Sequence, residues 1–147
     1  MNASQVGYTF QNDSLLEKAL THRSFANEHA MSSGNESLAL LGDAVLQFFV
    51  TSRLYQMETS GTPGLLTEKR KSFVCEEALA EKARRIGLGE VILFGKGEKQ
   101  QGGPSKTSHL SETFEALIGA IFLDGGTEKV FQFLSEQFHE LHKGDLR

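Results

Sequence analysis

The stretch that decides the fold is Asn-Glu-Ser-Leu-Ala-Leu-Leu-Gly-Asp-Ala-Val-Leu, residues 35–46. Apolar residues continue from it to residue 57 at spacings of three and four, which predicts a central, mostly buried helix over residues 36–57. Glu36 and Asp43 are seven residues apart, so two helical turns place both carboxylates on one side. Asp43 falls within the most apolar helix of the chain, where an unpaired carboxylate is costly. We therefore expect Asp43 to be paired with a base, a backbone donor or a metal ion.

A second acidic cluster lies near residue 115. Glu112 and Glu115 are three residues apart and precede the run Ala-Leu-Ile-Gly-Ala, residues 116–120. If this helix crosses the first one near Asp43, with Gly42 allowing a close approach, three or four carboxylates converge. Hard oxygen ligands in that arrangement suit Mg²⁺ or Mn²⁺ and metal-assisted phosphodiester hydrolysis. Alternatively, the acids lie on solvated faces and never meet, which spacing alone favours because charged residues are mostly exposed.

The rest of the chain also has helical periodicity. Helices are predicted close after Asn12, over residues 65–74, 76–86 and 108–123, and after Thr127. Gly87 is expected to end one of them in a left-handed conformation. In the last helix the apolar stripe omits Phe133, which we expect to face a partner subunit. No strand pair is apparent, so we predict an all-α fold with a single domain over residues 1–147.

Composition narrows the classes of function. The 147 residues are 39% hydrophobic and carry 15 basic and 19 acidic side chains, a net charge of −4 that argues against a general basic surface for nucleic acid. One cysteine, Cys75, cannot form an internal disulfide, which favours a reducing, cytoplasmic location. The apolar runs are shorter than the ~20 residues that span a bilayer, so no membrane association is expected. The glycine-containing residues 95–99 lack the context of a P-loop, so no nucleotide cofactor is expected.

Residues 35–46 resemble the signature of the ribonuclease III family of double-stranded-RNA endonucleases. Other segments match that family in order and spacing: residues 7–24 with the ending Thr-His-Arg-Ser, residues 78–89, residues 95–103, and Phe-Glu-Ala-Leu-Ile-Gly-Ala-Ile-Phe-Leu-Asp at 114–124. The likeness covers nearly the whole chain. It implies the helical endonuclease-domain fold, a homodimer, and a divalent-metal-dependent endoribonuclease that hydrolyses double-stranded RNA lying between the subunits.

The same resemblance assigns the site residues. It implies metal ligands at Asp43, Glu112 and Glu115, with Mg²⁺ as the cofactor and Mn²⁺ as an alternative. It implies catalytic roles for Asp43, Glu115 and Glu36. The glycine-containing loop would contact RNA through Glu98, Lys96 and Lys106.

Two positions depart from the family pattern. Ala39 stands where the family has a glutamate that ligates the metal, and Glu112 stands where it usually has an aspartate. Loss of one carboxylate should weaken the site, although water can fill a vacant position on Mg²⁺. The departures are compatible with an active enzyme that has a rearranged site, or with an inactive RNA-binding or dimerising protein. A deliberately introduced alanine is a third interpretation.

Three further expectations concern basic residues and the end of the chain. Basic residues cluster at 69–71, at Lys82 with residues 84–85, and around residues 96–106, and such local clusters set phosphate contact. We expect His22 and Arg23 to complement the dipole at the end of the first helix, and we assign no role to His109. Many family members carry a C-terminal double-stranded-RNA-binding domain, and the sequence ends at Arg147 without one.

Overall fold

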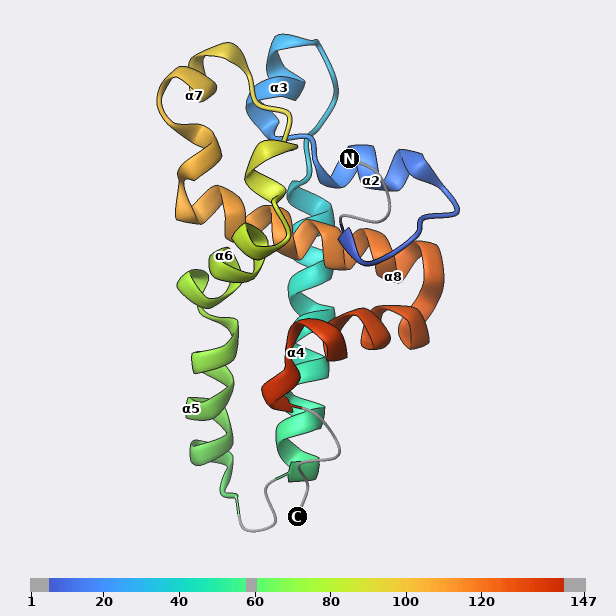
Figure 1. Ribbon diagram of the computed structural model, residues 1–147, viewed down its shortest axis with the longest axis vertical. Helices are drawn as coiled ribbons and strands as arrows, with labels where there is room; N and C mark the ends of the chain where they lie inside the picture. The colour runs from blue at the N-terminus through green and yellow to red at the C-terminus, as the bar shows by residue number, and fades with distance from the viewer. Residues whose placement is uncertain (1–5, 58–60, 142–147) are drawn as a thin grey trace.

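The computed structural model describes residues 6–57 and 61–141 (Figure 1). Its α-helices are α2 (Asp13–Ala19), α3 (Arg23–Glu28), α4 (Glu36–Met57), α5 (Pro63–Val74), α6 (Glu76–Arg85), α7 (Lys96–Gln100) and α8 (Thr107–Gln137). Short 3₁₀ turns are η1 (Leu88–Glu90), η2 (Gly103–Ser105) and η3 (His139–Leu141). Within these ranges the structure has no strand, only an isolated bridge between Thr21 and Leu93. The all-α prediction is confirmed.

Helices α4 and α8 cross at the centre of the molecule (Figure 1). Two glycines form the crossing point. A Cβ atom on Gly42 would lie 1.7 Å from the carbonyl oxygen of Glu115, and one on Gly119 would lie 2.3 Å from the carbonyl oxygen of Leu38. Neither position therefore accommodates a side chain, and the close approach expected at Gly42 is observed.

The core lies around this crossing. Helix α4 follows the predicted bounds and buries the apolar residues that face α8. Phe133 is only 2% exposed and packs near Phe114, with ring centroids 6.3 Å apart, so the prediction that it faces a partner subunit is wrong. The reason is that Phe133 follows Val130 by three residues and belongs to the same buried stripe.

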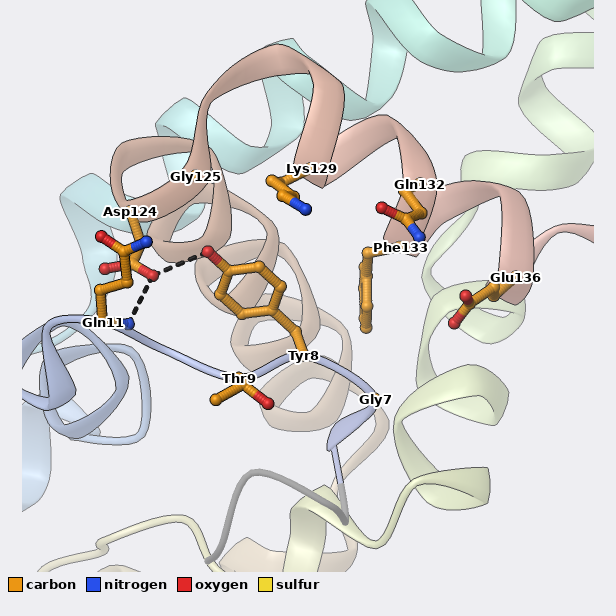
Figure 2. Close-up of a pocket in the computed structure, with 10 residues that line it drawn as sticks. All are labelled: Gly7, Tyr8, Thr9, Gln11, Asp124, Gly125, Lys129, Gln132, Phe133 and Glu136. Carbon is orange, nitrogen blue, oxygen red and sulfur yellow. Dashed lines mark hydrogen bonds between the residues drawn. The ribbon is translucent and has the colours of Figure 1, made fainter.

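Helix α8 is bent at Gly126, which has φ +77° and ψ −174°. Just before the bend, Asp124 ties the helix to the N-terminal segment (Figure 2). Its carboxylate accepts hydrogen bonds from the Tyr8 hydroxyl at 2.7 Å and from the amides of Gln11 and Asn12 at 2.9 Å. A polar cavity of about 450 Å³ lies between this segment and the second half of α8.

Most helix ends have the expected local chemistry. Gly87 follows α6 with φ +72°, as predicted. Helix α5 begins at Pro63, two residues earlier than predicted, because Thr62 caps it and Pro63 occupies its first position. The first helix ends at Ala19, so neither His22 nor Arg23 is in its last turn, and that expectation is wrong for both. His22 caps α3, and Arg23 is the first residue of α3.

One helix in the described part of the chain, α4, is long and apolar enough to cross a membrane by length and composition. In this structure it packs against α8 and α5, and it carries Glu36 and Asp43. Part of its apolar surface is buried inside the protein, and 39% of its most apolar stretch is covered.

Candidate active site and basic loop

The two acidic clusters meet where α4 crosses α8. Asp43 from α4 and Glu112 and Glu115 from α8 line one open cavity of about 450 Å³. The crossing at Gly42 sets this arrangement, because it brings the Glu115 backbone directly against α4. The structure thus brings together the three residues predicted to ligate a metal ion. We call this cavity the acidic cavity.

The acidic cavity holds uncompensated negative charge. Burial, followed by a hydrogen bond to Asp43 and the charges of Asp43 and Glu112, raises the pKa of Glu115 to about 8. Two carboxylates that share a site cannot both ionise readily, so the pair holds a proton near neutral pH. The Asp43 carboxylate also accepts a 3.3 Å hydrogen bond from the Gln47 amide.

This donor set fits a hard divalent cation, which would take the place of the shared proton. Ala39 also lines the acidic cavity, and its methyl group offers no oxygen ligand there. In residues 6–57 and 61–141, no three His, Cys, Asp or Glu side chains form a ready-made metal cluster. The ligands present therefore leave positions on Mg²⁺ for water.

For two other glutamates, the sequence did not predict correctly whether they line the acidic cavity. Glu36 does not line the acidic cavity; its carboxylate accepts a 3.1 Å hydrogen bond from the amide of Gly34 at the start of α4. Glu76, the first residue of α6, does line it. Sequence reasoning missed Glu76 because its approach depends on how α6 packs against α8, and no local motif marks it.

The loop of residues 95–106, called the basic loop below, leads directly into α8. Within it, one Glu98 carboxylate oxygen contacts Lys106 Nζ at 2.8 Å and His109 Nε2 on the first turns of α8. Hydrogen bonds from Lys106 and His109 lower the pKa of Glu98 to about 2. Glu98 therefore holds the loop against α8 and fixes the Lys106 ammonium, while its role toward RNA stays a prediction.

The other side of the basic loop is fixed to α3. The amide of Lys96 donates to both carboxylate oxygens of Glu28 at 2.9 Å, which caps α7. The amide of Gly95 donates to Ser24 Oγ, also at 2.9 Å. The side chains of Lys96 and Lys99 are exposed on the loop.

The remaining basic clusters are largely engaged within the protein. Lys82 is buried; its ammonium donates to the carbonyl of Gln137 at 2.8 Å and lies 4.2 Å from the Phe138 ring centroid. Arg85 pairs with Glu81 at 2.9 Å. Lys82 and Arg85 are therefore engaged in contacts within the protein, whereas the lysines of the basic loop are more exposed to solvent.

Helix α4 also exposes apolar side chains beside the acidic cavity. Leu40 is 74%, Phe48 61% and Tyr55 74% exposed. With Ala44 they recur at intervals of four, four and seven residues, so they lie along one face. Leu40 also lines the acidic cavity, so this face reaches the site. We call it the apolar stripe.

Comparisons with known proteins agree with the fold. The family model described as Ribonuclease-III-like matches residues 12–141. The chain is 42% identical over 139 residues to Ribonuclease 3 of Symbiobacterium thermophilum and 45% identical over 135 residues to that of Bdellovibrio bacteriovorus, covering 95% and 91% of this chain. The matches cover 59% and 58% of those relatives, so the chain spans less than two thirds of their length.

A solved structure gives the same result. The nuclease domain of ribonuclease III from Campylobacter jejuni superimposes with a TM-score of 0.88 at 36% identity and covers 93% of each chain. That structure is described as showing flexibility in a region involved in dimer formation. With the family model spanning α2 to η3, these likenesses show that the chain belongs to the ribonuclease-III-like family.

Proposed function

We propose that this protein is a divalent-metal-dependent endoribonuclease that hydrolyses phosphodiester bonds of double-stranded RNA as a homodimer. The observation that carries the proposal is the acidic cavity, where Asp43 from α4 meets Glu112 and Glu115 from α8. The raised pKa of Glu115 supports it. Relatives named Ribonuclease 3 support the reaction class.

Asp43, Glu112 and Glu115 would hold the cation, Mg²⁺ or alternatively Mn²⁺. A bound divalent cation supplies Lewis acidity toward a phosphoryl oxygen and a more acidic water molecule. The protein's own part is to fix the two carboxylates across the glycine crossing, which leaves them little freedom to separate. The resemblance gives Glu36 a catalytic role. Glu36 lies one turn before Ala39 on α4, so it would act from outside the cavity wall.

The site is weakened by Ala39 in this proposal. A methyl group in the cavity wall removes one oxygen ligand and one negative charge. The Glu112 side chain is one methylene longer than that of an aspartate, and this extra reach would partly compensate for the ligand lost at Ala39. Such a site should need more metal ion for half-maximal activity than one with the full set of carboxylates.

The homodimer would form through the apolar stripe. Large exposed apolar patches on a small protein commonly mark interaction sites, and Leu40, Phe48 and Tyr55 supply one on α4. Because Leu40 borders the acidic cavity, a partner on the stripe would lie beside the site. RNA would then contact the exposed lysines of the basic loop, Lys96 and Lys99, with Lys106 held by Glu98. We propose a cytoplasmic location, which the unpaired cysteine Cys75 supports.

A second candidate is an inactive RNA-binding or dimerising protein of the same fold. It is favoured by Ala39 and by the lack, within the described residues, of a ready-made cluster of three metal-binding side chains. The apolar stripe and the basic loop would serve that role equally well.

A cleavage assay separates the two candidates. The chain is incubated with long duplex RNA and Mg²⁺ or Mn²⁺, beside Glu115→Gln and the matched control Glu128→Gln, an exposed residue of α8 outside the acidic cavity. The proposal expects metal-dependent cleavage by the wild type and the control and a loss of at least about 100-fold in Glu115→Gln. Equal cleavage by all three proteins, or none by any, would overturn the metal-hydrolysis proposal.

A further inference from the structure

His22 is a buried histidine whose hydrogen bonds require it to be neutral. Only 5% of the residue's surface is exposed to solvent. Nδ1 accepts a 3.1 Å hydrogen bond from the amide of Ser24 and lies 2.7 Å from Ser24 Oγ. A backbone N–H can only donate, so Nδ1 must be the unprotonated nitrogen and Nε2 must carry the proton.

Ser24 connects this ring to the basic loop. Its hydroxyl oxygen accepts the amide of Gly95 at 2.9 Å, which leaves the hydroxyl proton to donate to His22 Nδ1. The same junction is closed by backbone bonds between the amide of His22 and the carbonyl of Leu93 at 3.0 Å, and between the amide of Leu93 and the carbonyl of Leu20 at 2.8 Å. His22 thus lies at the point where the basic loop is anchored on the α2–α3 connection.

The surroundings of the ring oppose a positive charge. A second proton would have to go on Nδ1, where it faces the Ser24 amide, and the Nε2–H of the buried ring has no hydrogen-bond partner among the described residues. The His109 ring on α8 lies 4.4 Å away between centroids. Burial, followed by His109 and Arg23 of α3, lowers the pKa of His22, while Glu98 of α7 and Glu36 of α4 act in the opposite direction.

We propose that His22 is a positioning residue for the basic loop, acting through Ser24 on Gly95, and that protonation of its ring loosens the loop. A proton on Nδ1 faces the Ser24 amide, so the cap of α3 is lost and Ser24 must move. The inference about the loop stands on these contacts alone. Its consequence for RNA rests on the proposed function, because the loop carries Lys96 and Lys99.

The first test is a titration of the wild-type chain by NMR of the imidazole nitrogens. We expect unprotonated Nδ1 and protonated Nε2 in His22 at pH 7.5, and a titration midpoint below the ordinary histidine value of about 6.5. His29, an exposed residue at the C-terminal end of α3, serves as the internal reference. Protonated Nδ1 at pH 7.5, or a midpoint at or above about 6.5, overturns the proposal.

The second test follows the Gly95 amide by hydrogen exchange. At pH values below the His22 midpoint, the protection factor of Gly95 should decrease by up to about tenfold per pH unit, the slope expected for one proton. His22→Asn keeps a capping acceptor that cannot titrate, so its Gly95 protection should stay constant, while the control His29→Asn should follow the wild type. A constant value in the wild type, or the same fall in His22→Asn, overturns the proposal.

Ser24→Ala keeps the test decisive if His22→Asn does not fold. It removes the hydroxyl between the two groups, so Gly95 protection should be low at every pH and independent of the His22 midpoint. Persistent coupling of Gly95 to His22 in this variant contradicts the proposed connection.

The RNA consequence is tested separately, by the Kd for duplex RNA from pH 8 to pH 5. The ratio of wild-type to His22→Asn Kd should rise several-fold below the His22 midpoint, and parallel curves overturn a role of His22 in RNA binding. No binding by either protein at any pH contradicts the proposed function instead, and the NMR and exchange results still decide the positioning role.

Discussion

Ala39 is the residue on which we expect the level of activity to depend. Asp43 and Glu115 are held close enough to share a proton, and burial raises the pKa of Glu115 to about 8. That arrangement is unfavourable for the bare protein and becomes favourable when a cation binds. Ala39 lies in the same cavity wall and contributes no oxygen. The residues present thus retain the electrostatic reason to bind a metal ion but lack part of the ligand set.

Restoring a carboxylate at this position should strengthen metal binding. For Ala39→Glu we expect Mg²⁺ or Mn²⁺ affinity to rise on the order of tenfold or more, because ligand charge tunes affinity for hard cations. Isothermal titration calorimetry measures it. Gln56→Glu, which adds the same charge at an exposed position of α4 outside the acidic cavity, is the control and should change affinity far less. Equal gains in the two variants would show a general charge effect in place of a site.

At the scale of elements, the α4–α8 crossing places the acids. The carbonyl oxygen of Glu115 occupies the space that a Cβ at Gly42 would need, so the crossing permits only glycine there. The contact joins the helix that carries Asp43 to the one that carries Glu112 and Glu115.

Gly42→Ala should therefore lower the free energy of unfolding by about 3 kcal/mol or more, since overpacking against backbone cannot be relieved by side-chain rotation. Chemical denaturation measures the change. Gly97→Ala is the matched control, because a Cβ at Gly97 has nothing within 4 Å, and its effect should stay within about 1 kcal/mol. A small effect at Gly42 would mean that the helices can separate freely, contrary to this account.

The Glu98 pair with Lys106 and His109 predicts a pH dependence of stability. The pKa of Glu98 is lowered to about 2 in the folded protein, so its contribution is present above its ordinary pKa of about 4.5 and is lost as pH falls toward 2. Glu98→Gln should therefore be less stable than the wild type at pH 7, with the difference shrinking below pH 4.5. Thermal unfolding from pH 7 to pH 2 measures this, and a constant difference would contradict the pairing.

The elements were predictable from the sequence where the signals are local. Helix α4 was predicted at residues 36–57 because its periodicity is unbroken, and the turn at Gly87 because glycine favours positive φ. The pairing of Glu98 with His109 and the cap by His22 were missed, because they depend on segments that meet only after the chain folds. The convergence of the two acidic clusters was stated as conditional on a crossing, which sequence spacing cannot establish.

In the molecule as a whole, the apolar stripe is a continuous apolar face of α4 that the described residues leave exposed. Phe48 stands over the Phe131 ring at a centroid distance of 5.4 Å and remains 61% exposed. Phe133, expected at an interface, is buried instead, because the stripe of α8 is wider than its strongest apolar positions suggest. We therefore expect the subunit interface on α4, along the apolar stripe, and not on α8.

A charge on the apolar stripe should prevent self-association. We expect the wild type to sediment as a dimer and Phe48→Asp as a monomer at micromolar concentration, because a buried unpaired carboxylate opposes the interface. Leu123→Asp is the control: Leu123 is an exposed apolar residue of α8 outside the stripe, and this variant should remain a dimer. A dimeric Phe48→Asp would exclude the stripe as the interface.

The central claim is that a divalent metal ion binds between Asp43 and Glu115. The most direct measurement is the anomalous scattering of Mn²⁺ in crystals of the chain grown with that ion. The account predicts a peak within coordination distance of carboxylate oxygens from both residues, on the side of the acidic cavity that Ala39 lines. A Mn²⁺ peak elsewhere with none at this pair, or no peak at saturating Mn²⁺, would contradict it.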